Sequence, residues 1–190
     1  MFAFPPRVAA TVLAAVFPSP VPAEPPPPPR VVVLATDLNN LSNQPDDPAE
    51  LPRLALLTTA LRARLAAACG YDVVPLDSAT EASAHVGVAY AYAHPEVAAQ
   101  LAASVGAEWV VALRLNRIGS WVAEFEANVV RVRDSALVGT LAVSLRGFGM
   151  GSDLTARLTE RGAASMADQV AQAIDRAAAP HAPVARRCPP

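Results

Sequence analysis

The chain has 190 residues, the size of one ordinary domain, and 53% of them are hydrophobic, which is enough apolar material for a single core. It carries 15 basic and 17 acidic residues, with the basic ones spread along the chain. A nucleic-acid-binding protein would normally show a basic stripe, so composition and charge argue against that class of function.

The first 23 residues have the pattern of a secretory signal peptide. Arg7 supplies the positive charge, residues 8–17 are apolar, and small residues lead to Ala23, after which we expect cleavage. So short an apolar stretch does not span a bilayer as a stable helix, and an uncleaved anchor is the alternative interpretation. No cysteine lies near this site, so no lipid attachment is expected. We expect a periplasmic or secreted protein without a stable membrane anchor after cleavage.

Proline marks both ends of the expected domain. Residues 24–30, EPPPPPR, predict an extended polyproline spacer. Residues 179–190 contain proline and small residues without apolar periodicity, which is typical of a flexible tail. Between these segments, residues 31–178 are expected to form a single domain.

The first predicted strand is followed by the clearest helix in the chain. The β-branched run RVVVLATDL (residues 30–38) has little alternation, as in a strand buried on both faces. From Pro48, leucines at positions 51, 54, 57, 61 and 65 share one helical face, and Gly70 ends the helix. Asp46 or Asp47 is available as its N-cap.

Next come a second strand and a second helix. YDVVPL (residues 71–76) predicts the strand. In HPEVAAQLAASVG (residues 94–106), Pro95 takes a first helical position and Gly106 ends the helix.

Three runs with period two then predict an antiparallel meander: residues 108–116, 121–129 and 137–147. Three-residue loops keep their apolar faces aligned, and this register places Glu124 opposite both Arg114 and Arg146. Such a ladder of charges stabilises a solvated sheet face modestly.

The apolar pattern slips after Val129. Val130 and Val132 become the apolar positions, while Arg131 and Arg133 take the other face. A bulge, or an edge segment that twists out of the sheet, is expected there. The final helix is predicted within residues 151–178, interrupted by Gly162.

The element order is therefore strand, helix, strand, helix, three strands, helix. It predicts an α/β (α+β) fold with a mixed sheet, a three-stranded antiparallel meander, and helices packed mainly on one face.

With the segments VVVLATDL, GYDVVPL, LAASVGAEWVVALRL and RVRDSALVG, this order resembles the α/β domain shared by the TolB amino-terminal domain, CsgG-type curli-secretion proteins and penicillin-binding-protein activators. The run from GAEWVV through SLRGFGMGSD resembles a family of small secreted bacterial proteins of unknown function. The resemblance covers about residues 30–175 and implies protein binding in the cell envelope, with no partner identified. Envelope members with known roles are usually lipoproteins or parts of larger assemblies, and this sequence lacks a lipid-bearing cysteine.

The loop after the first strand is rich in the oxygen ligands that hard cations prefer. These residues are Asp37, Asn39, Asn40, Asn43, Asp46, Asp47 and Glu50. The helix-loop calcium signature fails, because Leu41 occupies a ligand position. The favoured interpretation is that these residues form turns and cap the following helix. The alternative is a cation site, for which Asp37, Asn39, Asp46 and Asp47 are the candidate ligands.

The two cysteines leave two alternatives open. Cys69 and Cys188 can form a disulfide in an oxidising compartment. Otherwise Cys69 is a small buried residue and Cys188 an exposed thiol. The three histidines, His85, His94 and His181, lack metal-binding spacing, so no zinc site is expected.

No nucleophile elbow, phosphate loop or nucleotide fingerprint is present. Glu124 and Glu126 are two apart on one strand face, but arginine neighbours would keep both ionised and inert. We therefore expect neither enzymatic activity nor a cofactor.

Trp121 lies beside a turn, where it could form a partner-binding surface with Arg131 and Arg133 of the meander tip. The alternative, a Trp121 packed in the core, is favoured. The leading hypothesis is a non-enzymatic binding or accessory module that contacts an envelope protein through the meander tip or the exposed sheet edge. The alternative is a periplasmic carrier of a small ligand or cation that uses residues 37–50.

Overall fold

A computed structural model describes residues 27–46, 48, 50–85, 87, 89–147, 152–178 and 188, with side chains of the last helix from residue 156. The expected signal peptide, Asp47 and most of the expected tail lie outside the described residues. None of the helices that the structure describes is both long and apolar enough to cross a lipid bilayer.

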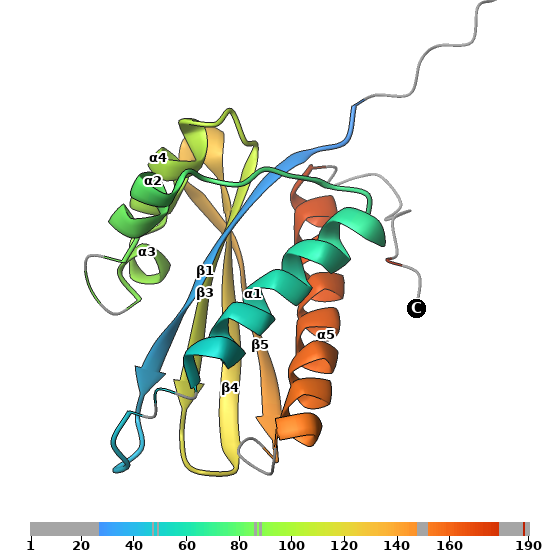
Figure 1. Cartoon of the computed structure of the whole chain (residues 1–190). Coiled ribbons are helices and arrows are strands. Elements are labelled where there is room, and N and C mark those ends of the chain that lie inside the picture. The colour runs from blue at the N-terminus through green and yellow to red at the C-terminus, as the bar shows by residue number, and fades with distance from the viewer. Residues whose placement is uncertain are drawn as a thin grey trace, which may run out of the picture.

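The described residues form a five-stranded mixed sheet flanked by helices (Figure 1). The elements are β1 (Arg30–Asn40), α1 (Glu50–Ala67), β2 (Asp72–Val73), α2 (Ser78–Ser83), α3 (Tyr90–Ala93), α4 (Pro95–Ala103), β3 (Trp109–Arg117), β4 (Val122–Arg131), the 3-10 turn η1 (Val132–Asp134), β5 (Ala136–Arg146) and α5 (Ser152–Ala178). The α/β class and the three-stranded meander are confirmed. Two short helices, α2 and α3, add to the predicted order, and α1 begins at Glu50 rather than at Pro48.

The strand order is β2-β1-β3-β4-β5. Strand β1 pairs in parallel with β2 on one side and β3 on the other, whereas β3, β4 and β5 pair antiparallel. The chain therefore leaves β1 in one lateral direction to reach β2 and returns past β1 to reach β3.

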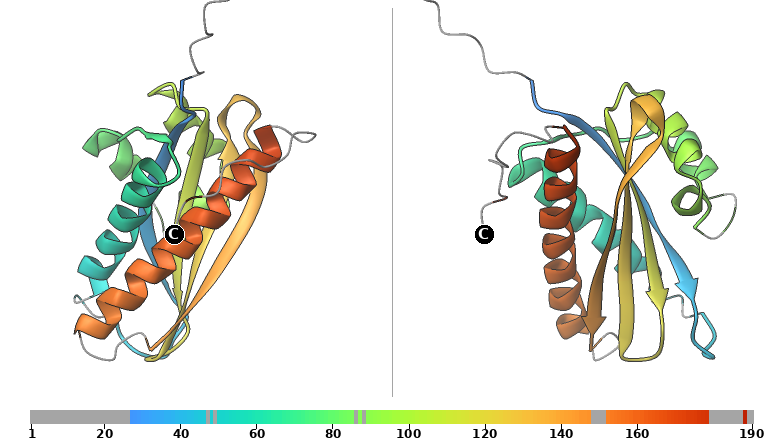
Figure 2. Two further views of the ribbon diagram at one scale, coloured as in Figure 1. Left: turned by 90° about the vertical axis from the view of Figure 1, so that its right-hand side faces the viewer. Right: turned by 180° about the vertical axis from the view of Figure 1, so that it is seen from behind.

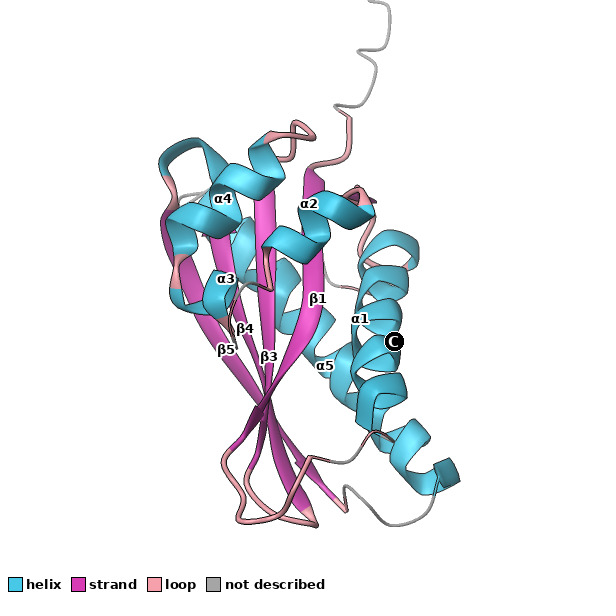
Figure 3. Ribbon diagram, turned by 60° about the vertical axis from the view of Figure 1, so that its left-hand side comes forward, coloured by secondary structure: helices cyan, strands magenta, loops and turns pink. Residues whose placement is uncertain are grey.

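This path decides which face each helix covers. Crossovers between parallel strands are right-handed, so two crossovers in opposite lateral directions place their helices on opposite faces. Helices α1 and α5 lie on one face, and α2, α3 and α4 on the other (Figures 1 and 3). The prediction of helices mainly on one face thus holds for the two long helices only.

Each face has its own hydrophobic core. Leucines of α1 (Leu57, Leu61 and Leu65) and α5 residues such as Met166 and Ile174 pack against Phe125 of β4. On the other face, Ala98, Ala99 and Ala102 of α4 pack on Val32, Val110 and Val130. The small alanine side chains allow α4 to approach the sheet closely.

The two cores explain the slip in the apolar pattern. Val129 belongs to the core under α5, and the next residue, Val130, belongs to the core under α4. Both faces are covered at this point, so consecutive residues are buried. The pairing of β4 with β5 also shifts register between Val129 and Val130, which confirms the predicted irregularity.

The predicted register of the meander is wrong by two residues. Arg114 pairs with Glu126, not Glu124, and Glu124 pairs with Ser144, not Arg146. A shift of two residues leaves every side chain on its own face, so the apolar alternation cannot distinguish the two registers.

Gly162 does not interrupt α5, which is continuous from Ser152 to Ala178. A Cβ atom at this position would lie 2.5 Å from Cδ2 of Leu145. The glycine therefore lets the helix pack closely on β5, and close packing rather than a break accounts for it.

Candidate functional site

Asp37, the first expected metal ligand, is engaged by a histidine. It lies on β1, and its Oδ1 atom is 2.6 Å from Nδ1 of His85, which follows α2. Both side chains are largely buried. The pair ties the end of β1 to the segment between α2 and α3.

The Asp37–His85 pair makes stability depend on pH. Hydrogen bonding to Asp37 raises the pKa of His85 above its ordinary value of 6.5. The folded protein holds this proton more tightly than the unfolded chain, so the stabilisation is complete below the unfolded pKa and is lost as pH rises through the folded pKa. We expect the melting temperature of the wild type, relative to His85→Asn, to fall between about pH 6 and pH 8. Thermal unfolding of both proteins measures this, with the exposed His94→Asn as control; parallel curves for wild type and His85→Asn would contradict it.

The other expected ligands do not converge on a common point. Asn39 donates from Nδ2 to Oδ1 of Asn116 at 2.8 Å, whereas Nδ2 of Asn40 donates to Oδ1 of Asp46, also at 2.8 Å. Consecutive strand residues point to opposite faces, so these two pairs are separated by the sheet. Asp46 is thus bonded within the loop, and Asp47 lies outside the described residues.

Glu50, also expected as an oxygen ligand, instead forms a buried ion pair with Arg117 at the end of β3. Oε1 of Glu50 accepts from Nη1 of Arg117 at 2.6 Å, and the two side chains are only 6% and 5% exposed. Arg117 also donates to Oγ of Ser42 at 3.2 Å and to the carbonyl of Pro45 at 3.0 Å. One guanidinium group therefore holds the loop after β1 to the start of α1.

Large apolar side chains are exposed around this buried pair. Trp121 is 58% exposed in the β3–β4 loop, so the favoured prediction of a core position is wrong. Leu41, Ile118 and Val122 are also exposed, and we call these four residues the apolar end. The amide of Leu41 donates to the carbonyl of Arg117 at 2.9 Å, which joins the two loops. They lie at the lower end of the sheet in Figure 1.

Arg131 and Arg133 do not share a surface with Trp121. The ten residues of β4 separate the β3–β4 loop from the β4–β5 turn, a distance of about 33 Å at 3.3 Å per residue. The predicted combination of Trp121 with the two arginines in one partner surface is therefore wrong, because a hairpin places its loop and the next turn at opposite ends.

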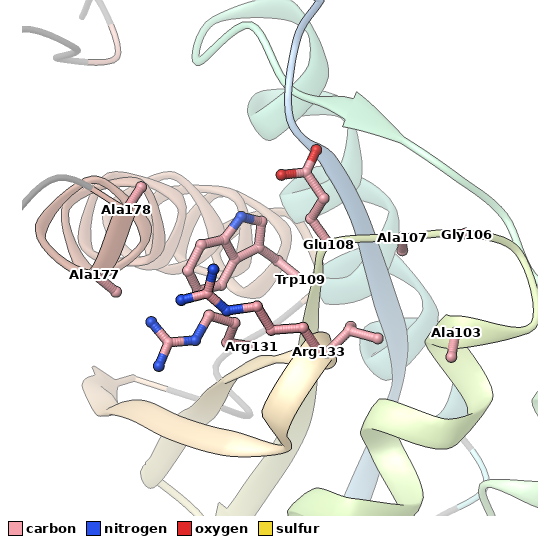
Figure 4. Close-up of a pocket in the computed structure, with 10 residues that line it drawn as sticks. Ala103, Gly106, Ala107, Glu108, Trp109, Arg131, Arg133, Ala177 and Ala178 are labelled. Carbon is pink, nitrogen blue, oxygen red and sulfur yellow. The ribbon is translucent and has the colours of Figure 1, made fainter.

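The two arginines line a cavity of about 460 Å³ at their own end (Figure 4). Its walls come from residues 103 and 106–109, from residues 131–133 and from the end of α5 at residues 177 and 178. Arg131 donates to both carboxylate oxygens of Asp134, and these bonds hold the pKa of Asp134 below its usual value. Arg133 is the exposed guanidinium of the cavity, and the buried Trp109 provides its apolar side.

Glu126 lies in a network of hydrogen bonds on the sheet face toward α3. Nε of Arg114 and the hydroxyl of Tyr92 both donate to its Oε2 at 3.0 Å, and the Arg114 guanidinium lies 4.1 Å from the centre of the Tyr92 ring. Burial, with the Glu126 carboxylate beside it, raises the pKa of Tyr92 to about 12. Tyr92 is thus protonated near neutral pH, and the network is suited to holding α3 against the sheet.

Residues 29–149 match the model of DUF3280, a family described as "Protein of unknown function (DUF2380)". The chain belongs to this family. The expected resemblance to a family of unknown function is thereby confirmed. No curated protein matches the sequence.

Several solved structures are similar to this DUF3280 member. The hypothetical protein CT253 from Chlamydia trachomatis is 16% identical, with a TM-score of 0.50, over 76% of this chain and 99% of that chain. The LpoB C-terminal domain from Salmonella enterica is 15% identical, with a TM-score of 0.45, over 62% and 82%. TolB from Acinetobacter baumannii is 13% identical, with a TM-score of 0.44, over 79% and 29%. The TolB likeness expected from the sequence is therefore weak.

The region matched to DUF3280 contains Arg117, Glu50 and the apolar end, but not Cys188. In the structure Cys188 forms a disulfide with Cys69, which follows α1. Asp168 of α5 lies beside the bond, and these three residues are the one group of three or more His, Cys, Asp or Glu ligand atoms close together among the described residues. Sulfur atoms joined in a disulfide are not thiolate ligands, so the group forms a covalent link rather than a metal site.

Arg117 is the residue that sequence reasoning missed. A charged residue at the end of a strand suggests a solvated position, whereas Arg117 is 4% exposed. The available signal was Glu50, an acidic residue in the first turn of α1 that needs a partner if it is buried.

Proposed function

We propose that the protein is a non-enzymatic binding module that docks a protein partner in the bacterial cell envelope through its apolar end. The observation that carries the proposal is the exposure of Trp121 on the same joined loops as three exposed aliphatic side chains, Leu41, Ile118 and Val122. Exposed clusters of this kind mark interaction sites, and tryptophan is among the residues that most often dominate binding energy.

Side-chain bonds that hold the loops of the apolar end in place favour binding. Arg117 and Glu50 fix the loop after β1 and the start of α1, and Nε2 of Gln44 donates to Oγ of Ser120 at 2.7 Å. A surface that is ordered before binding loses less conformational entropy when a partner docks. The envelope location rests on the signal-peptide pattern of residues 1–23.

The alternative of a cation carrier finds less support. Asp37, Asn39 and Asp46 each bond to another side chain of the protein. A cation would have to break these bonds before it gained its ligands, so we do not develop the carrier hypothesis further.

Site-specific crosslinking tests the proposed surface. We expect a photo-crosslinking residue at position 121 to capture one envelope protein, and the same residue at position 133, which is exposed at the other end of the sheet and outside β5, to capture none. Trp121→Ala should weaken binding of the captured protein by about 30-fold, the effect of a 2 kcal/mol hot spot, without changing the melting temperature. Equal capture from both positions, or unchanged affinity of Trp121→Ala, would count against the proposal.

A further inference from the structure

The two edges of the sheet are treated differently, and the β1 side is protected. Strand β2 pairs only with Arg30 and Val31, which leaves most of β1 at the edge. There the pairing with β3 shifts register between Val33 and Thr36. Arg62 of α1 donates to the carbonyl of Val33 at 3.0 and 2.6 Å, and the amide of Thr36 donates to Oγ1 of Thr58 at 3.0 Å. An irregular strand with occupied backbone groups is a poor template for another strand.

The β5 side has fewer of these protections, because its register shift lies near one end of the strand. Strand β5 is the outermost strand, and Figure 2 shows it along the free edge beside α5. Residues 136–145 contain no charged residue and no proline. The register shift opposite Val129 and Val130 leaves residues 139–145 in regular pairing, and within the described chain no backbone hydrogen bond joins this strand to a segment other than β4. A long, uncharged, regular edge is a template for strand addition.

The direction of the free backbone groups follows from one hydrogen bond. The amide of Gly147 donates to the carbonyl of Trp121 at 2.7 Å, in the register of the β4–β5 pair. In an antiparallel pair, hydrogen-bonded residues alternate with residues whose backbone groups point away. Thr140, Ala142 and Ser144 therefore direct their amide and carbonyl groups outward from the sheet.

We propose that β5 pairs antiparallel with β5 of a second copy of this chain, on a two-fold axis at Ala142, so that the two sheets become one. In this register, Ala142 pairs with the partner's Ala142, and Thr140 pairs with the partner's Ser144. On the face of the sheet that α5 covers, Leu141 lies opposite the partner's Val143. All three outward residues of each copy find hydrogen-bonded partners, and apolar side chains meet apolar ones.

A second copy fits this edge because the strand is complementary to itself. The nearest charge within β5, Arg146, comes opposite the partner's Val138, so no like charges face each other across the axis. Two-fold pairing uses the β5 edge of both copies, and the remaining edge on each side is the protected β1 edge. Association therefore closes at a dimer and does not continue into a filament. This interface is at a different place from the apolar end, so it goes beyond the proposed function.

Cysteine crosslinking of the purified protein, with its Cys69–Cys188 bond intact, tests the register. Ala142→Cys is expected to give a disulfide-linked dimer, because hydrogen-bonded antiparallel partners have Cα atoms about 5.5 Å apart, within disulfide range. Thr140→Cys alone is the matched control. Its own counterpart in the second copy lies four residues along the strand, about 13 Å away, so no crosslink is expected. The double variant Thr140→Cys/Ser144→Cys should restore crosslinking.

Light scattering over a concentration series gives the independent measurement. We expect twice the monomer mass for the wild type and the monomer mass for Ala142→Pro. The amide at position 142 has no partner in β4, so proline there removes only intermolecular bonds, and edge strands tolerate it. A monomer mass for the wild type at every concentration, a dimer that survives Ala142→Pro, or equal crosslinking of Thr140→Cys and Ala142→Cys would each overturn the proposal.

Discussion

Replacing Arg117 with alanine is expected to lower the free energy of unfolding by about 3–5 kcal/mol. Arg117 and Glu50 are both almost fully buried, and the substitution leaves the Glu50 carboxylate without its main partner in a region of low polarity. It also removes the bonds to Ser42 and Pro45 that hold the loop after β1. Urea denaturation followed by circular dichroism measures the loss.

The double variant Arg117→Met/Glu50→Leu separates the ion pair from the packing. When both charges are replaced by apolar groups of similar volume, neither is left unpaired, so the loss should shrink to about 1 kcal/mol or less. An Arg117→Ala variant as stable as the wild type would show that the pair is not buried in solution. The surface substitution Arg133→Ala, at the opposite end of the sheet, should leave stability unchanged.

Replacing Cys188 with serine is expected to lower the free energy of unfolding by about 4–5 kcal/mol. The disulfide joins residues 119 apart in the sequence, so it greatly restricts the unfolded chain. In the chain-entropy view this restriction, rather than contacts in the folded state, supplies the stability. Urea denaturation of both proteins under non-reducing conditions measures the difference.

The reduced wild type provides the control for this substitution. A reducing agent should bring the wild type close to Cys188→Ser and leave Cys188→Ser itself unaffected. Identical stability of the oxidised wild type and Cys188→Ser would contradict the prediction, because it would show that the disulfide does not stabilise the protein by restricting the unfolded chain. Free thiol titration under denaturing conditions should detect none in the oxidised wild type.

The sequence was most informative where a pattern depended on local geometry. Gly70 and Gly106 follow their helices with φ angles of 71° and 67°, the left-handed conformation that glycine adopts readily. The period-two runs predicted the three strands of the meander, and the change in the apolar pattern after Val129 predicted the register shift. Each of these signals lies within a few residues of the feature that it predicts.

Features that depend on distant partners were not predictable in the same way. The meander register could shift by two residues without moving any side chain to the other face. That helices cover the second face of the sheet could be predicted only from the strand order, and this order depends on the pairing between β1 and β3. The burial of Arg117 depended on Glu50 from another element, and the exposure of Trp121 on the absence of a helix over that loop in the described structure.

The position of β1 has a consequence for how the chain can be assembled. It is the first strand that the structure describes, yet both of its neighbours come later, and β3 ends only at Arg117. The apolar residues Val31, Val32, Val33 and Leu34 therefore emerge long before their neighbouring strands exist. By contrast, β3, β4, β5 and α5 follow one another and can pair as they are synthesised. Until β3 is complete, the N-terminal strand is an exposed β-forming segment that must be kept from binding other chains.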